Sequence, residues 1–230
     1  MEIYVDTARI EEIESVKGMV SGITTNPTLM RKAGVLDYLE HARSLSRTFP
    51  LTPLSLEVIA DVPDEMLVQG HKLSEIGHNV IVKIPIVNSK GESCEDVVHE
   101  LTTAGIMINV TAVFTYEQFE IARGALIDTG GIVSVFAGRI ADTGIDPVAM
   151  VRRMARELRK HNKPRVKLLW ASTREILNYE HAEAAMCDII TMTPDLVLKR
   201  GKLRHKDLVE FSVDTASMFY EDARKSGYSI

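Results

Sequence analysis

Short apolar runs alternate with amphipathic stretches along the whole chain, and this alternation predicts eight strand–helix units. The runs are rich in β-branched side chains, as expected for strands that are buried on both faces. Most stretches between them space their apolar residues like a helix that packs on one side. The predicted strands are 3–6, 22–25, 54–59, 80–84, 106–113, 132–137, 166–171 and 189–192. The predicted helices are 9–16, 36–46, 63–76, 94–104, 116–128, 146–161, 174–184, 194–198 and 206–226.

Strands that alternate with helices over short connections lie parallel, and eight of them can close into a (β/α)8 barrel. The 230 residues fit the usual length of that fold. No Gly-x-Gly-x-x-Gly follows the first strand, which disfavours a dinucleotide-binding open sheet. We therefore expect an α/β protein whose residues 1–230 form a single TIM-barrel domain. Residues 206–226 would be an additional C-terminal helix that covers the barrel or docks on a neighbouring subunit.

Composition and charge exclude several classes of protein. The formal net charge of −5 argues against a general polyanion binder, and we expect no nucleic-acid partner. Cys94 and Cys187 lie far apart, which fits a reducing compartment. The chain shows no signal-peptide pattern and no apolar run of the ~20 residues that cross a bilayer. These features predict a cytoplasmic protein without a membrane partner.

The predicted strand 80–84 contains a lysine, Lys83, within an otherwise apolar run. Lysine is almost never buried unless it is paired or functional. Burial disfavours the ammonium form, and a neutral amine can form a Schiff base with a carbonyl compound. The alternative is an edge-strand lysine whose amine reaches water.

Polar residues also occur at or near the C-terminal ends of the other predicted strands, where the active sites of (β/α)8 barrels lie. They are Asp6, Thr24, Thr25, Asn26, Glu57, Asn109, Thr111, Ser134, Arg139, Ser172 and Arg174. Each alone could be a helix cap or a strand former. Together they form a plausible ring around Lys83.

This ring is chemically coherent. An iminium on Lys83 would allow a C–C bond of a ketose to break, and Asp6 or Glu57 could move the protons. Arg139, Ser172 and Arg174 could bind a phosphate. For an isolated arginine, a surface ion pair is the better alternative.

At this point the sequence resembles the transaldolase family, in particular its short subfamily related to fructose-6-phosphate aldolase, over nearly the whole chain. The order and spacing of Thr-Thr-Asn-Pro and Val-Lys-Ile-Pro is the most specific part of the resemblance. Its carriers are residues 4–7, 22–27, 82–85, 108–111, 134–140 and 171–174.

The resemblance implies a cofactor-free and metal-free transferase that moves a dihydroxyacetone unit from a ketose phosphate to an aldose phosphate, as in the pentose phosphate pathway. Lys83 would be the Schiff-base lysine, Asp6 the acid/base for C–C cleavage, and Glu57 with Thr111 the pair that activates water. The implied substrate-binding residues are Thr25, Asn26, Asn109, Ser134, Phe136, Arg139, Ser172 and Arg174. The resemblance also implies a homo-oligomer, either a pentamer or a decamer.

Two alternatives stay open. The first is aldolase-type cleavage that releases free dihydroxyacetone; Glu57, Ser134 and Phe136 match the transaldolase type instead. The second is a non-catalytic binder of sugar phosphates or polyanions, suggested by the basic run 199–206, which is more often a solvated connection between helices. Trp170 departs from the small residue usual at its position, and we expect it beside the phosphate site, where it would alter the acceptor or head group.

Overall fold

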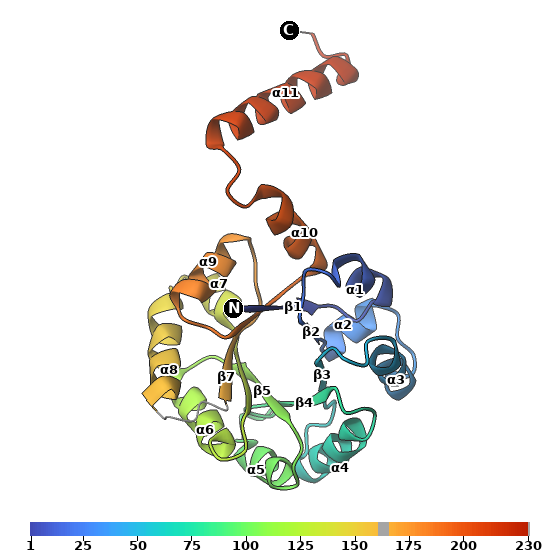
Figure 1. The fold of residues 1–230 in the computed structure, drawn as a ribbon, viewed down its shortest axis with the longest axis vertical. Coiled ribbons are helices and arrows are strands. Elements are labelled where there is room, and N and C mark those ends of the chain that lie inside the picture. The colour runs from blue at the N-terminus through green and yellow to red at the C-terminus, as the bar shows by residue number, and fades with distance from the viewer. Residues whose placement is uncertain (161–165, 230) are drawn as a thin grey trace.

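Eight parallel strands close into a barrel in the order in which they occur in the chain (Figure 1). The computed structural model describes residues 1–160 and 166–229. Every strand pairs with its sequence neighbours, and β1 pairs with β8 to close the ring. The expected TIM-barrel fold is therefore confirmed. The strands are β1 (Glu2–Asp6), β2 (Gly22–Thr24), β3 (Leu54–Glu57), β4 (Val80–Pro85), β5 (Ile108–Val113), β6 (Gly131–Val135), β7 (Val166–Trp170) and β8 (Ile189–Met192).

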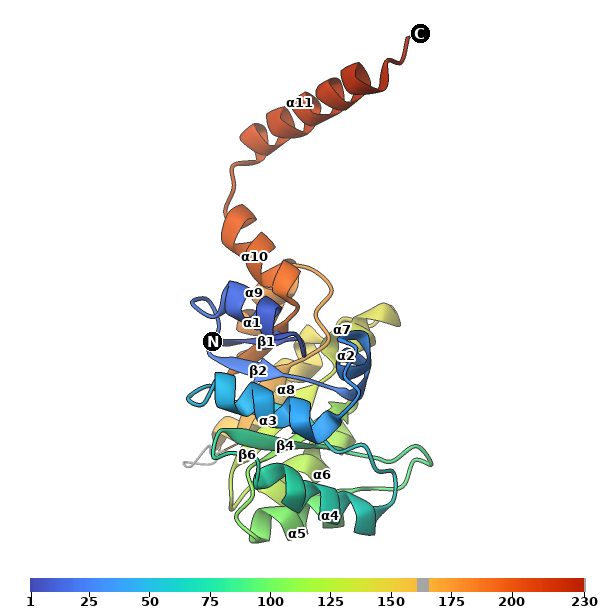
Figure 2. The same ribbon diagram turned by 90° about the vertical axis from the view of Figure 1, so that its right-hand side faces the viewer.

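Helices surround the barrel, and one helix stands clear of it (Figures 1 and 2). The helices are α1 (Ile10–Val16), α2 (Pro27–Lys32), α3 (Tyr38–Thr48), α4 (Pro63–Ser74), α5 (Glu95–Thr103), α6 (Tyr116–Leu126), α7 (Ala137–Asp142), α8 (Val148–Lys160), α9 (Leu177–Ala184), α10 (Pro194–Leu203) and α11 (Leu208–Ser226). No helix in the described part of the chain has both the length and the apolar character needed to cross a membrane.

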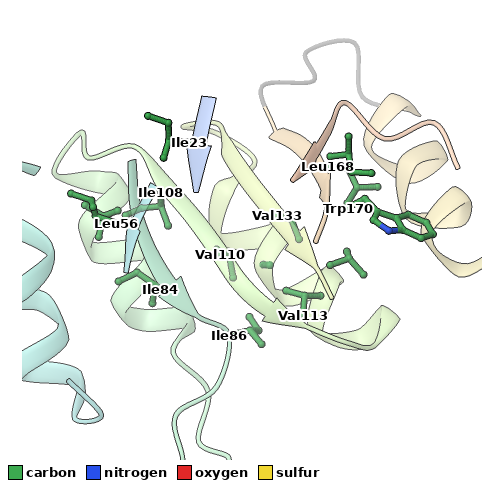
Figure 3. Packing of buried hydrophobic residues seen from close by; sticks show 14 of the residues in the cluster. Ile23, Leu56, Ile84, Ile86, Ile108, Val110, Val113, Val133, Leu168 and Trp170 are labelled. Atoms are coloured by element: carbon green, nitrogen blue, oxygen red, sulfur yellow. The ribbon is translucent and has the colours of Figure 1, made fainter. Parts of the chain in front are cut away.

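Side chains along each strand point alternately out of the barrel and into it, so the sheet has an apolar core on each face. Residues such as Leu56, Ile84 and Val110 lie in the large core between the sheet and the helices (Figure 3). A smaller cluster fills the inside of the barrel, and its members are Tyr4, Ile132, Leu169, Ala171 and Ile189. Above this inner layer the inward positions are polar, so the barrel carries its candidate chemistry on top of a closed apolar floor.

Gly22 makes room for the largest member of the inner cluster. A Cβ atom built on Gly22 would lie 2.4 Å from the Tyr4 ring, far closer than any real contact. Burial of the Tyr4 ring also raises the pKa of its hydroxyl to about 12. The missing side chain at Gly22 thus allows an aromatic ring to close the barrel floor.

The structure differs from the predicted elements at several points. The helical pattern after β2 is two helices, α2 and α3, and the predicted loop after β6 contains the short helix α7. Helices this short carry too few turns to show a clear periodicity. The predicted strand 106–113 begins at Ile108 in the structure. The predicted helix 146–161 begins at Val148, and its expected end at residue 161 lies outside the described residues.

Trp170 lies outside the barrel, so the expectation that it lies beside the phosphate site was wrong. Its neighbours Leu169 and Ala171 face inward, and strand alternation turns Trp170 toward the helices. The ring is 1% exposed and its centroid lies 6.3 Å from that of His181 in α9 (Figure 3). Trp170 is a packing residue of the outer core.

The basic run 199–206 is largely helical, because α10 continues to Leu203 instead of ending near residue 198. Arg200 stacks 3.6 Å from the centre of the Tyr179 ring, and Arg204 pairs with Glu180 at 3.2 Å. Arg204 also lies over Tyr179. These contacts attach α10 to α9, so two charges of the run have a structural role, and the interpretation as a plain solvated connection was incomplete.

Candidate active site

A cavity of about 500 Å³ opens at the C-terminal ends of the strands. All four residues predicted to be catalytic line it, together with six of the eight predicted binding residues. The two others, Thr25 and Asn109, are buried in the wall of the barrel and are not among the lining residues. The lining residues from the prediction are Asp6, Asn26, Glu57, Lys83, Thr111, Ser134, Phe136, Arg139, Ser172 and Arg174.

Lys83 points into the barrel from β4 and is only 5% exposed. Its Nζ lies 2.8 Å from Oε2 of Glu57 and donates a hydrogen bond of 2.8 Å to the carbonyl oxygen of Thr25. Glu57 is the direct register partner of Lys83 on the neighbouring strand β3, so the strand register places the two side chains together. A carboxylate this close to the amine is positioned to exchange a proton with it.

The backbone of Glu57 is held by Tyr38, the first residue of α3. The Tyr38 hydroxyl donates to the carbonyl oxygen of Glu57 at 2.7 Å. Burial and the negative charge of Glu57 raise the pKa of that hydroxyl well above its usual range. The hydroxyl therefore stays protonated and remains a hydrogen-bond donor.

Asp6 ends β1 and faces the same cavity. Burial raises the pKa of its carboxyl above the ordinary value, and the charge of Glu57 adds to this effect. Lys83 and a hydrogen bond from the Thr24 hydroxyl oppose it. A carboxyl group whose pKa is raised by burial, and held down by a nearby cation and a hydroxyl donor, is suited to accept and return a proton.

Three strands, β3, β5 and β6, contribute a network of neutral polar groups. The Ser134 hydroxyl donates to Oδ1 of Asn109 at 2.7 Å, and Nδ2 of Asn109 donates to the hydroxyl of Ser55 at 3.2 Å. In contrast, Oγ1 of Thr111 is buried and has no hydrogen-bond partner among the described residues. A buried hydroxyl that lines a cavity without a protein partner is available to a substrate or a water molecule.

Asn26 also serves the local fold. Its Oδ1 accepts a hydrogen bond of 2.9 Å from the backbone N–H of Leu29 and caps α2, with Pro27 at the first helical position. Its amide nitrogen stays available toward the cavity. Thr25 contributes through its backbone, because its carbonyl oxygen accepts from Lys83 while its hydroxyl donates to Ser55 at 2.9 Å.

The rim is built where α7 meets the loop after β7. Gly138 passes so close to this loop that an added Cβ atom would lie 1.6 Å from the carbonyl oxygen of Ser172. Ser172 has a φ of 66°, in the left-handed region that costs energy for a residue with a side chain. This close approach brings Ser172 next to Arg139, whose guanidinium lies 5.2 Å from the centre of the Phe136 ring.

The two rim arginines differ in their partners. Arg174 forms a two-pronged ion pair with Asp142 of α7, in which Nε lies 3.2 Å from Oδ1 and Nη2 lies 2.6 Å from Oδ2. The Arg174 guanidinium holds the pKa of the Asp142 carboxyl below its usual range, and Arg139 contributes to the same effect. Arg139 forms no ion pair within residues 1–160 and 166–229. A bound anion would therefore meet one unpaired and one already neutralised arginine.

Several functional candidates were missed from sequence. Thr191 lines the cavity, Asp142 pairs with Arg174, and Tyr38 bonds the backbone of Glu57. Thr24 belongs to the predicted ring of strand-end residues, but the sequence assigned it no role in the reaction. Asp142 and Tyr38 lie on helices and have no local sequence signal.

The site offers an amine, two carboxyl groups and two guanidinium groups around one cavity. No group of three or more metal-binding side chains occurs among the described residues. The arrangement can bind an anionic carbonyl compound, hold its carbonyl carbon near Nζ of Lys83 and exchange protons with two carboxyl groups.

Solved structures similar to this one share the barrel fold. One is 3-hexulose-6-phosphate synthase, with a TM-score of 0.60, 14% identity, and coverage of 84% of this chain and 90% of that one. Another is 3-keto-L-gulonate-6-phosphate decarboxylase from Vibrio cholerae, with a TM-score of 0.60, 10% identity, and coverage of 84% and 87%. At these identities the likeness concerns the fold alone.

Relatives with higher sequence identity are named probable transaldolases. The Thermus thermophilus protein is 32% identical, over 87% of this chain and 90% of its own length. The Bdellovibrio bacteriovorus protein is 32% identical, over 98% of this chain and 99% of its own length. The family model described as transaldolase/fructose-6-phosphate aldolase matches residues 3–228. This chain therefore belongs to the transaldolase/fructose-6-phosphate aldolase family.

Proposed function

We propose that this enzyme is a transaldolase that transfers a dihydroxyacetone unit from a ketose phosphate, such as fructose 6-phosphate or sedoheptulose 7-phosphate, to an aldose phosphate. The observation that carries the proposal is a buried lysine amine 2.8 Å from a carboxylate inside an open cavity. Family membership supports the same transferase chemistry.

The first step would attach the substrate to Lys83. Glu57 removes a proton from the ammonium group, and the free amine attacks the ketose carbonyl carbon at C2. Glu57 then shuttles protons so that the former carbonyl oxygen leaves as water and an iminium remains. Glu57 ends this step as a carboxylate, as it began, and the unpartnered hydroxyl of Thr111, which lines the same cavity, would hold the water.

The second step would break and remake a C–C bond. Asp6 takes the proton of the C4 hydroxyl, the C3–C4 bond breaks, and its electron pair moves into the iminium to give an enamine. The cleaved aldose phosphate leaves. C3 of the enamine attacks the aldehyde carbon of the acceptor, Asp6 returns its proton to the aldehyde oxygen, and water then releases the new ketose from Lys83.

The other lining residues would bind the substrate. Asn26 and Ser134 are suited to the hydroxyls of the dihydroxyacetone unit, with Asn109 fixing the Ser134 hydroxyl from behind. Arg139, Ser172 and Arg174 would hold the phosphate at the rim. Thr25 would act through its carbonyl oxygen on Lys83.

Borohydride trapping tests the proposal. The protein is incubated with fructose 6-phosphate and borohydride, and mass spectrometry should find the reduced adduct on the peptide that contains Lys83. Lys83→Met should abolish both adduct and turnover, whereas Lys90→Met, at an exposed lysine of the loop after β4, should retain both. An adduct elsewhere, or none, contradicts the mechanism and favours a non-catalytic binder.

Measuring free dihydroxyacetone separates transfer from cleavage. With fructose 6-phosphate and erythrose 4-phosphate, a transaldolase forms the new ketose phosphate and little free dihydroxyacetone. Release of free dihydroxyacetone at the rate of donor consumption would instead assign the aldolase reaction.

We further propose that the enzyme acts as a homo-oligomer, a pentamer or a decamer, in the cytoplasm. Helix α11 supports the oligomer, because none of its residues is buried although Leu208, Phe211 and Phe219 are apolar. Such a face is stable when another surface covers it. The two free, buried cysteines agree with a reducing compartment.

A further inference from the structure

Two threonine hydroxyls form a short chain that ends on Asp6. Oγ1 of Thr24 donates to Oδ1 of Asp6 at 2.7 Å. The same oxygen lies 2.5 Å from Oγ1 of Thr191. Thr24 is on β2 and Thr191 is on β8, the two strands that flank β1, so the contact spans the inside of the barrel above β1. Both residues are under 5% exposed, which makes the chain a fixed part of the wall.

Counting protons shows which of the two threonine hydroxyls donates to the other. Each hydroxyl carries one proton, and the proton of Thr24 is used on Asp6 when Asp6 is a carboxylate. The hydrogen bond between the two threonines must then be donated by Thr191. Thr191 is itself held through its backbone, because its carbonyl oxygen accepts from the hydroxyl of Thr173 at 3.1 Å.

The donor direction is kept when Asp6 gains its proton. The proton from the substrate arrives on Oδ2, because Oδ1 accepts from the Thr24 hydroxyl. Oδ1 of the neutral carboxyl group is then its carbonyl oxygen, and it still accepts from Thr24. Asp6 could thus gain and lose a proton without leaving a buried hydrogen-bonding atom unsatisfied between Asp6 and Thr24.

We propose that Thr191 is a positioning residue for Asp6 that acts through the hydroxyl of Thr24. This inference rests on the proposed function, in which Asp6 accepts and returns a proton. By polarising the Thr24 hydroxyl, Thr191 strengthens the hydrogen bond that stabilises the Asp6 carboxylate and fixes which oxygen faces the cavity. Thr191 therefore contributes to the chemical step without touching the C4 hydroxyl.

The charged groups that face Asp6 set the direction of the expected change. Lys83 on β4 favours the carboxylate, and Glu57 on β3 disfavours it, as does burial. The Thr24 hydroxyl adds to the effect of Lys83. Without the donor at Thr191, the hydrogen bond from Thr24 weakens and the pKa of Asp6 rises further.

Thr191→Val tests the proposal because valine keeps the shape and removes the hydroxyl, while Thr191→Ser keeps the hydroxyl. We expect Thr191→Val to lower kcat at neutral pH about three- to tenfold. The acid limb of the kcat/KM profile should move up by about half a pH unit to one unit. Thr191→Ser should restore both the rate and the profile.

Trapping on Lys83 serves as the independent control, because forming the iminium does not need Asp6. If wild-type protein gives no adduct on Lys83, the proposed function fails. If every variant gives the adduct but Thr191→Val and Thr191→Ser share one pH profile, the role of Thr191 fails. A lower kcat with an unmoved acid limb also overturns it, since that result indicates a merely structural residue. Should Thr191→Val not fold, Thr191→Ala compared with Thr191→Ser gives the same decision, because alanine also removes the Thr191 hydroxyl.

Discussion

At the scale of single residues, the charged side chains of the site differ in whether they have an ion-pair partner. Lys83 and Glu57 satisfy each other inside the barrel, and Arg174 is satisfied by Asp142 at the rim. Arg139 contacts the Phe136 ring but no carboxylate in the described part of the chain. A phosphate gains most from a cation that has no competing anion, so Arg139 should dominate phosphate binding.

The first prediction compares the two arginines. Arg139→Ala should weaken the binding of fructose 6-phosphate by ~1.5–3 kcal/mol, about 10- to 150-fold in KM, because one charge-assisted contact is lost. Arg174→Ala should have a smaller effect, since Asp142 already neutralises that charge. Steady-state kinetics with fructose 6-phosphate and with an unphosphorylated ketose checks both. An equal loss for both donors would contradict the role of Arg139 in phosphate binding.

At the scale of elements, α7 and the loop after β7 form the rim by close backbone contact. The N–H of Gly138 donates to the carbonyl oxygen of Ala171 at 3.2 Å, and Ser172 follows with its φ of 66°. Gly138 is needed because any side chain there would meet the Ser172 carbonyl. Ser172 and Arg139 are thus brought together by a glycine that has no chemical role of its own.

The second prediction concerns this glycine. Gly138→Ala should lower the thermal midpoint and raise KM for the phosphorylated donor, because the Ser172 loop must move away from α7. Gly124→Ala is the matched control, since an added Cβ atom on that residue of α6 meets nothing within 4 Å. It should stabilise the protein by about 0.5–1 kcal/mol through helix propensity. Thermal unfolding and KM for both variants check the prediction; equal behaviour of the two would refute the close-contact explanation.

At the scale of the whole molecule, α11 is the feature that the barrel alone does not explain. It begins after a well-formed cap, in which Asp207 accepts from Val209 and Glu210, and it extends away from the barrel (Figure 2). Phe211 and Phe219 lie on one face of the helix, along a groove with Leu208 and Thr215. An apolar helical face that meets no part of its own barrel fits a second copy of the chain, as proposed above.

The third prediction tests this face. The double substitution Phe211→Ser with Phe219→Ser should lower the molecular mass measured by light scattering from an oligomer to a monomer. Glu221→Ser, on the opposite face of α11, should leave the mass unchanged. A monomeric wild-type protein, or a double variant with unaltered mass, would exclude this face as the contact between subunits.

The barrel, and most of the residues that line its cavity, could be predicted from the amino-acid pattern alone. Alternating apolar runs identified eight strands, and an amine within a buried run marked Lys83, because burial of a charge is rarely accidental. Residues at successive strand ends could be assigned to one cavity because a closed parallel sheet places all these ends on one side. A feature could be predicted from the sequence wherever the residues that indicate it lie within a few positions of one another, as in a strand and its end.

The pairing of these residues, in contrast, follows from the folded arrangement of the chain. Strand register puts Glu57 beside Lys83. Helix α7 brings Asp142 to Arg174. Strand β8 brings the Thr191 hydroxyl to that of Thr24, which donates to Asp6. Alternation turns Trp170 outward, although its position next to Ala171 had suggested a place in the site. Such contacts join residues that are distant in sequence, and a pairing depends on the final distance and direction of two side chains, which no local pattern carries.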